Sequence, residues 1–163
     1  MSVNRYLPHV VVLPEDDANR QVANGFLRDQ YLSFWRIQVL EEAGGWNKVL
    51  ECFLSDHVAA MKRYTGRFMV LLIDFDGEEG RLQDAKALIP GNLQDRVFVL
   101  GALSEPEALK RAIPGSYETI GLALARDCRE KTNTTWGHNL LRHNASELDR
   151  LREYVRPILF PPI

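Results

Sequence analysis

Acidic side chains follow three apolar runs of this 163-residue chain, at the positions where strands are expected to end. The acids are Glu15, Asp16 and Asp17 after HVVVL, Asp74 and Asp76 within DFDG after FMVLLI, and Glu105 after RVFVLGAL. Crowded carboxylates raise one another's pKa unless a cation neutralises them. Carboxylate oxygens are also the ligands that Mg²⁺ and Mn²⁺ prefer. These acids therefore predict a metal or phosphoryl site.

The spacing of these acids separates structural roles from chemical ones. Asp16 or Asp17 can cap the helix that follows, near its positive end. Glu15 has no such structural role. Asp74 and Asp76 are two residues apart, so both point to the same side of an extended chain. Because ligands of open parallel sheets gather at the carboxyl ends of the strands, Glu15 and DFDG are expected to meet there.

Apolar runs predict the strands that must position these acids. The runs at 10–13 and 68–73 are continuous in apolar residues, which is typical of parallel strands covered on both faces. WRIQVL at 35–40 and RVFVLGAL at 96–103 are expected to be further strands, whereas KVLECFL at 48–54 fits either a strand or a helix.

Helical periodicity fills the intervals between the strands. Ala18, Val22 and Phe26 predict a helix to about residue 28, and Ser55 is expected to cap a short helix that stops at Gly66. A further helix at 82–89 ends at Pro90-Gly91, and the sequence 104–107 fits a capping box.

The chain after residue 115 is expected to be helical. Ser116 is a candidate cap, and Asn144 with Glu147 resembles the start of a capped helix. Alternating strands and helices predict an α/β fold with a three-layer parallel sheet. We expect one domain over 1–163, with a core at about 8–113 and additional C-terminal helices at about 116–163.

Composition limits the classes of function. Lys and Arg number 20 against 22 Asp and Glu, a net charge of −2, which argues against a broad basic face for nucleic acid. Cys52 and Cys128 are far apart and are interpreted as core thiols of a reduced interior. The chain lacks a signal-peptide pattern and an apolar run long enough to cross a bilayer, so a cytoplasmic protein without membrane contact is expected.

The acidic motifs resemble those of the Toprim domain of topoisomerases, primases and OLD-type nucleases. LPED around Glu15 and LLIDFDG around Asp74 and Asp76 resemble its glutamate and Asp-x-Asp motifs, and Glu105 resembles an acid of the nuclease-like branch. This likeness implies Mg²⁺ or Mn²⁺ held at Asp74 and Asp76, proton transfer by Glu15, and nuclease-like phosphodiester chemistry on nucleic acid. It covers about two-thirds of the chain, and it departs where Asp16 replaces a common glycine.

A second resemblance is to the receiver domain of response regulators. VVVLPEDDANR resembles its first strand and acidic pair, which implies phosphorylation of Asp74 with Ser104 as the switch hydroxyl. A receiver also needs a lysine after a further strand, and no strand-like run follows Leu103. A third alternative is a degenerate Toprim-like interaction domain that binds no metal.

Other motifs give little support to a different chemistry. His138 and His143 are five residues apart and do not predict a zinc pair, and no complete nucleotide-binding fingerprint is present. The apolar tail PILFPPI is expected to lie across the domain surface, with a homodimer or protein partner as the alternative.

Overall fold

A parallel sheet forms the centre of the protein. The computed structural model describes residues 3–78 and 80–162. Its sheet has four strands in the order β2-β1-β3-β4, and every neighbouring pair is parallel. The strands are β1 (His9–Pro14), β2 (Ile37–Val39), β3 (Arg67–Leu72) and β4 (Val97–Leu100). All six residues of β1 are buried, which confirms the expectation from its apolar sequence.

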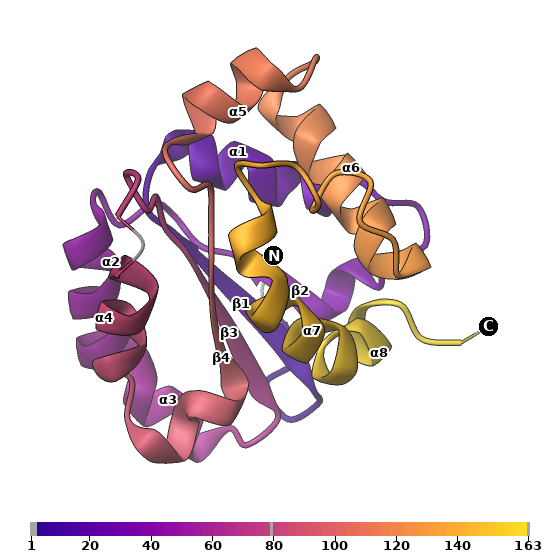
Figure 1. The fold of residues 1–163 in the computed structure, drawn as a ribbon. Coiled ribbons are helices and arrows are strands. Elements are labelled where there is room, and N and C mark those ends of the chain that lie inside the picture. The colour runs from indigo at the N-terminus through magenta and orange to yellow at the C-terminus, as the bar shows by residue number, and fades with distance from the viewer. Residues whose placement is uncertain (1–2, 79, 163) are drawn as a thin grey trace.

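Helices cover both faces of this sheet, so the expected three-layer α/β fold is confirmed (Figure 1). One face packs against α2 (Trp46–Cys52), α3 (Val58–Arg63) and α4 (Arg81–Ala87). The other packs against α1 (Asp17–Phe26), α5 (Pro106–Ala112), α6 (Tyr117–Glu130), α7 (Ala145–Tyr154) and α8 (Arg156–Leu159). None of the helices in the described residues is long and apolar enough to span a membrane.

Several local expectations from the sequence are wrong. Ser55 caps no helix, because α2 continues through a π-helical segment at Phe53–His57 directly into α3. The expected strand at 35–40 begins with a 3₁₀ turn at Phe34–Arg36 and is extended only over Ile37–Val39. The N-cap of α5 is Glu105 rather than Ser104, and no side chain accepts a capping hydrogen bond there. Ser116 does cap α6, accepting from the Thr119 amide at 3.1 Å.

Side chains of α7 occupy the outer edge of β4. The Glu147 carboxylate is fully buried and accepts a 3.0 Å hydrogen bond from the amide of Val99. The Asn144 side chain bonds both the amide and the carbonyl of Gly101, at 3.2 and 3.0 Å. Asn144 and Glu147 therefore do not form the expected capping box, because the sheet edge takes their polar groups.

Helices α1 and α6 approach each other backbone to backbone at two glycines. A Cβ atom on Gly121 would lie 1.9 Å from the Val22 carbonyl oxygen, and one on Gly25 would lie 2.1 Å from that of Glu118. Contacts this short leave no room for any side chain. The position of α1 over the sheet is therefore set directly by α6.

Gly121→Ala is expected to lower the free energy of unfolding by about 2 kcal/mol, because the added methyl group forces the two helices apart. Urea denaturation followed by circular dichroism measures this loss. Gly91→Ala is the matched control, since a Cβ there meets nothing within 4 Å. Similar losses in both variants would contradict the close approach of α1 and α6.

Glu147→Ala is expected to cost about 3–5 kcal/mol, because it leaves buried backbone groups and the Lys86 and Arg150 cations without their acceptor. Glu153→Ala on the exposed side of the same helix is expected to change stability by less than about 0.5 kcal/mol. Denaturation curves that do not separate these variants would show that Glu147 is dispensable at the β4 edge.

Candidate functional site

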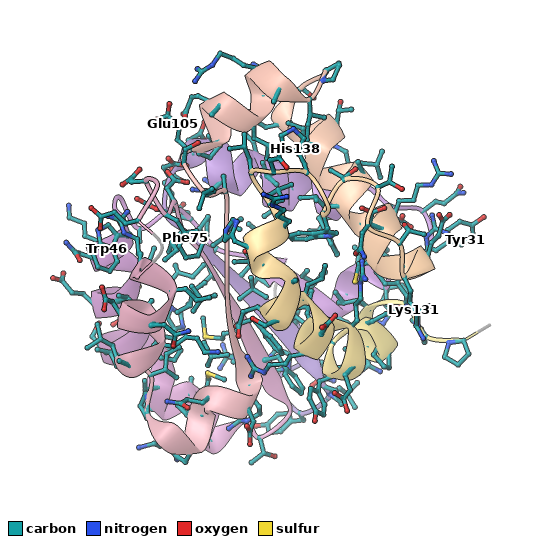
Figure 2. All side chains as sticks on the ribbon, in the orientation of Figure 1. Tyr31, Trp46, Phe75, Glu105, Lys131 and His138 are labelled. Atoms are coloured by element: carbon teal, nitrogen blue, oxygen red, sulfur yellow. The ribbon has the colours of Figure 1, made fainter. Side chains whose placement is uncertain are left out.

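Two of the predicted acids, Glu15 and Asp74, meet at the carboxyl ends of β1 and β3, where the strand order reverses. The chain leaves β1 toward α1 on one face of the sheet and leaves β3 toward α4 on the other. Such a divergence opens a crevice beyond the strand ends. Figure 2 shows Trp46, Phe75 and Glu105 around this end of the sheet, at the upper left of the view.

Glu15 and Asp74 form the centre of this site. Both residues are buried, with 9% and 7% of their surfaces exposed. The Glu15 Oε2 atom accepts a hydrogen bond of 2.5 Å from the Asp74 amide, which joins the two strand ends. The Asp74 Oδ1 atom accepts one of 3.0 Å from the Asn19 side chain of α1. No described residue donates a hydrogen bond to the remaining oxygen of either carboxyl group.

The charges of this site oppose the ionisation of its two central acids. Burial raises the pKa of Asp74 to about 7, although the Asn19 hydrogen bond favours the charged form and the charges of Glu15, Asp16 and Asp76 favour the neutral one. Burial also raises the pKa of Glu15, against the Asp74 amide hydrogen bond, and Asp16 and Asp76 raise it further. The site therefore carries less cationic charge than its carboxylates need.

Asp76 lies in a turn that projects from this site. Its φ angle is +49° and that of Gly77 is +74°, and both amides bond carbonyls of the segment after β4. The Asp76 Oδ2 atom accepts a 2.7 Å hydrogen bond from Arg81, whereas half of its side chain remains exposed. Asp76 is thus brought to the edge of the site rather than to its buried centre.

The remaining candidate ligands lie further out. Asp16 caps α1, accepting from the Asn19 amide at 2.8 Å, and its charge still acts on Glu15 and Asp74. Asp17 is exposed and bonds Gln21 on its own helix. Glu105 is exposed at the start of α5 and pairs with Arg111 at 3.7 Å. Among the described residues, no three His, Cys, Asp or Glu side chains are arranged to hold a metal ion.

Arg81 is the main site residue that the motifs did not identify. Its guanidinium donates to the Asp74 carbonyl at 2.9 Å and to Asp76, and it lies 4.5 Å from the centre of the Trp46 ring. Arg81 is the first residue of α4, where the helix dipole disfavours a cation. A cation at such a position needs an anionic partner. An arginine at the start of the expected helix, just after the DFDG acids, was therefore the sequence feature that could have identified Arg81.

A cleft of about 360 Å³ lies beside the Asp76 turn. Phe75, Glu78 and Leu82 line one side of it, and the 139–143 segment lines the other. The His143 ring packs edge-on against Phe75, and burial lowers the pKa of this imidazole. His138 instead accepts a hydrogen bond from the Leu140 amide. The two histidines therefore have separate environments.

Asp74→Asn is expected to remove a pH dependence of stability. Because the native pKa is about 7 and the ordinary value is 3.8, the native state favours the protonated acid, and stability falls as pH rises between these values. The free energy of unfolding of the variant, relative to that of the native chain, should therefore rise by roughly 3 kcal/mol from about pH 5 to about pH 8.

Urea denaturation in EDTA at the two pH values measures this difference. Asp84→Asn, at an exposed position of α4, is the control and should follow the native chain at both pH values. If the free energy of unfolding changes with pH by the same amount in the native chain and in both variants, Asp74 has an ordinary pKa.

Comparisons of the chain with family models, curated proteins and solved structures gave no match.

Proposed function

We propose that the acids at the ends of β1 and β3 bind Mg²⁺ or Mn²⁺ and that the protein carries out metal-dependent phosphodiester chemistry on nucleic acid. The observation that carries this proposal is the pair of buried carboxyl groups, Glu15 and Asp74, at the point where the strand order reverses. Burial raises the pKa of Asp74 to about 7, and a bound cation would stabilise the ionised form of such a buried acid.

The donor set fits a magnesium-type ion. Such an ion is usually held by one or two carboxylates together with waters and substrate phosphates, so three preassembled ligands are not required. Asp74 and Asp76 would hold the ion through carboxyl oxygens that accept no hydrogen bond from the described residues. A bound metal would polarise the phosphodiester and activate water.

Two further residues have roles that their positions support. Glu15 bonds the Asp74 amide and would complete the coordination, and burial raises the pKa of its carboxyl group, which suits a role in proton transfer. Arg81 contacts Trp46 and the Asp74 carbonyl, and its guanidinium would stabilise negative charge on a phosphate bound beside the acids.

The receiver-like alternative has less support. A receiver places a lysine near the phosphorylated aspartate, after a strand beyond β4. Here Glu147 and Asn144 occupy the outer edge of β4, and the cation beside the acids is Arg81. Incubation with acetyl phosphate and Mg²⁺, followed by intact mass measurement, distinguishes the two: a labile phosphoryl adduct on Asp74 would replace the nuclease proposal.

The decisive experiment measures cleavage of end-labelled DNA and RNA, single-stranded and double-stranded, with Mg²⁺, with Mn²⁺ and with EDTA. Asp74→Asn and Glu15→Gln are each expected to lower the metal-dependent rate by at least about 100-fold. Asp84→Asn keeps the same net charge as Asp74→Asn and should retain the rate. Thermal melting of each variant tests whether a lost rate is caused by unfolding.

Calorimetric titration tests the metal site separately from catalysis. Binding of Mn²⁺ should release a proton near neutral pH, because the ion displaces the proton of Asp74. Cleavage that persists in both site variants would overturn the assignment, and an absence of binding heat would leave the degenerate interaction domain in its place.

A further inference from the structure

Three arginines surround Tyr64 at the opposite end of the sheet from the acids. The guanidinium carbons of Arg5, Arg63 and Arg67 lie 5.7, 5.4 and 5.5 Å from the centre of the Tyr64 ring. Tyr6 packs edge-on against the same ring, with 5.7 Å between centroids, and is 83% exposed. We refer to Tyr6, Tyr64 and these three arginines as the tyrosine–arginine cluster.

The cluster has no acidic counter-charge among the described residues. None of its arginines forms an ion pair there, whereas exposed arginines elsewhere do, such as Arg111 with Glu105 and Arg126 with Glu130. Burial lowers the pKa of Arg67, and the charge of Arg5 lowers it further. Like charges are therefore held together at this end of the protein without compensation.

Neighbouring residues hold this charge in place rather than neutralise it. Arg67 donates a 2.9 Å hydrogen bond to the His9 ring, and burial lowers the pKa of that imidazole, so His9 acts as a neutral acceptor. Arg36 bonds the Pro8 carbonyl, and Arg96 bonds the carbonyls of Tyr64, Arg67 and Met61. These contacts add two more cations to the same end of the sheet.

The location of the cluster separates it from the acidic site. His9 and Arg67 are the first residues of β1 and β3 and pair with each other across the sheet. In Figure 1 this end lies at the bottom, near the label of α3. Strands of six residues place it about 20 Å from the acids. A chain with a net charge of −2 is thus strongly polarised from one end of the sheet to the other.

We propose that the tyrosine–arginine cluster binds single-stranded nucleic acid. The exposed guanidinium groups of Arg5 and Arg63 contact phosphates, and Tyr6 stacks on an unpaired base. Arginines beside an exposed aromatic ring favour nucleic acid over an acidic peptide, whose carboxylates do not stack. They favour a single strand over a duplex, because paired bases hide the faces that Tyr6 would contact. This binding does not depend on the metal chemistry proposed for the acidic site.

Fluorescence anisotropy in EDTA tests the proposal with labelled single strands of DNA and RNA of about 15 nucleotides and with the corresponding duplexes. The native chain should bind the single strands more tightly, with a logarithmic salt slope of about −1.4 for the two phosphate contacts of Arg5 and Arg63. Tyr6→Ala should weaken binding by roughly tenfold through lost stacking, whereas Tyr6→Phe should not.

A charge-matched pair of double variants separates local recognition from net charge. Arg5→Ala with Arg63→Ala should weaken binding at least about tenfold, whereas Arg111→Ala with Arg126→Ala should leave it within about twofold. All four arginines are exposed, and thermal melting confirms that each variant is folded. Equal effects of the two pairs, or tighter binding of the duplex, would overturn the proposal. Binding of the native chain to phosphatidylserine vesicles but not to the oligonucleotides would assign the cluster to a membrane surface instead.

Discussion

The buried Glu147 carboxylate at the outer edge of β4 is the contact on which the attachment of α7 to the sheet depends. A parallel edge strand exposes unpaired amides and carbonyls, which invite another strand. Glu147 accepts from the Val99 amide of β4, and Asn144 bonds the amide and the carbonyl of Gly101 directly after the strand. Lys86 and Arg150 provide the positive charge that compensates for the burial of Glu147. These contacts fix α7 along the outer edge of β4. At the other side of β3, the strand order β2-β1-β3-β4 reverses between β1 and β3.

That reversal explains why the acids gather where they do. The chain leaves β1 toward a helix on one face and β3 toward a helix on the other, while the two strand ends stay paired and bring Glu15 and Asp74 together. The Asp74 amide donates a hydrogen bond to the Glu15 carboxylate across the two strand ends. The same geometry buries both carboxyl groups, and this burial raises the pKa of each. The reversal of strand order therefore places the two acids close together and also disfavours their ionised forms. The opposite end of the sheet, which carries the tyrosine–arginine cluster, has an excess of positive charge instead.

The sequence predicted what depends on local chemistry and missed what depends on distant partners. Continuous apolar runs identified β1 and β3 because both faces of these strands are buried, and Ser116 was identified because its capping bond reaches only three residues along the chain. Asn144 and Glu147 carry the pattern of a cap, but their polar groups bond Gly101 and Val99, at and just after β4, which precede them by more than 40 positions. Arg81 and Asn19 were missed for the same reason, since their contacts with Asp74 exist only once the strands are assembled. The convergence of Glu15 with DFDG was predictable because parallel strands bring their ends together, whereas the outward positions of Asp17 and Glu105 follow from the turns of individual helices.

The two hydrophobic clusters also bear on how the chain reaches this fold. The face of β1 that carries Val10 and Val12 is covered by Ile120, Leu151 and Leu159, which come more than 100 residues later. The other face packs mainly on segments before residue 100. During synthesis, α1 can cover the first face only in part until the last helices emerge, whereas the second face can be buried much earlier. Contacts between such distant segments slow folding and leave apolar surface open to aggregation in the meantime. The burial of the first strand is thus completed only when the helices at the end of the chain pack on it.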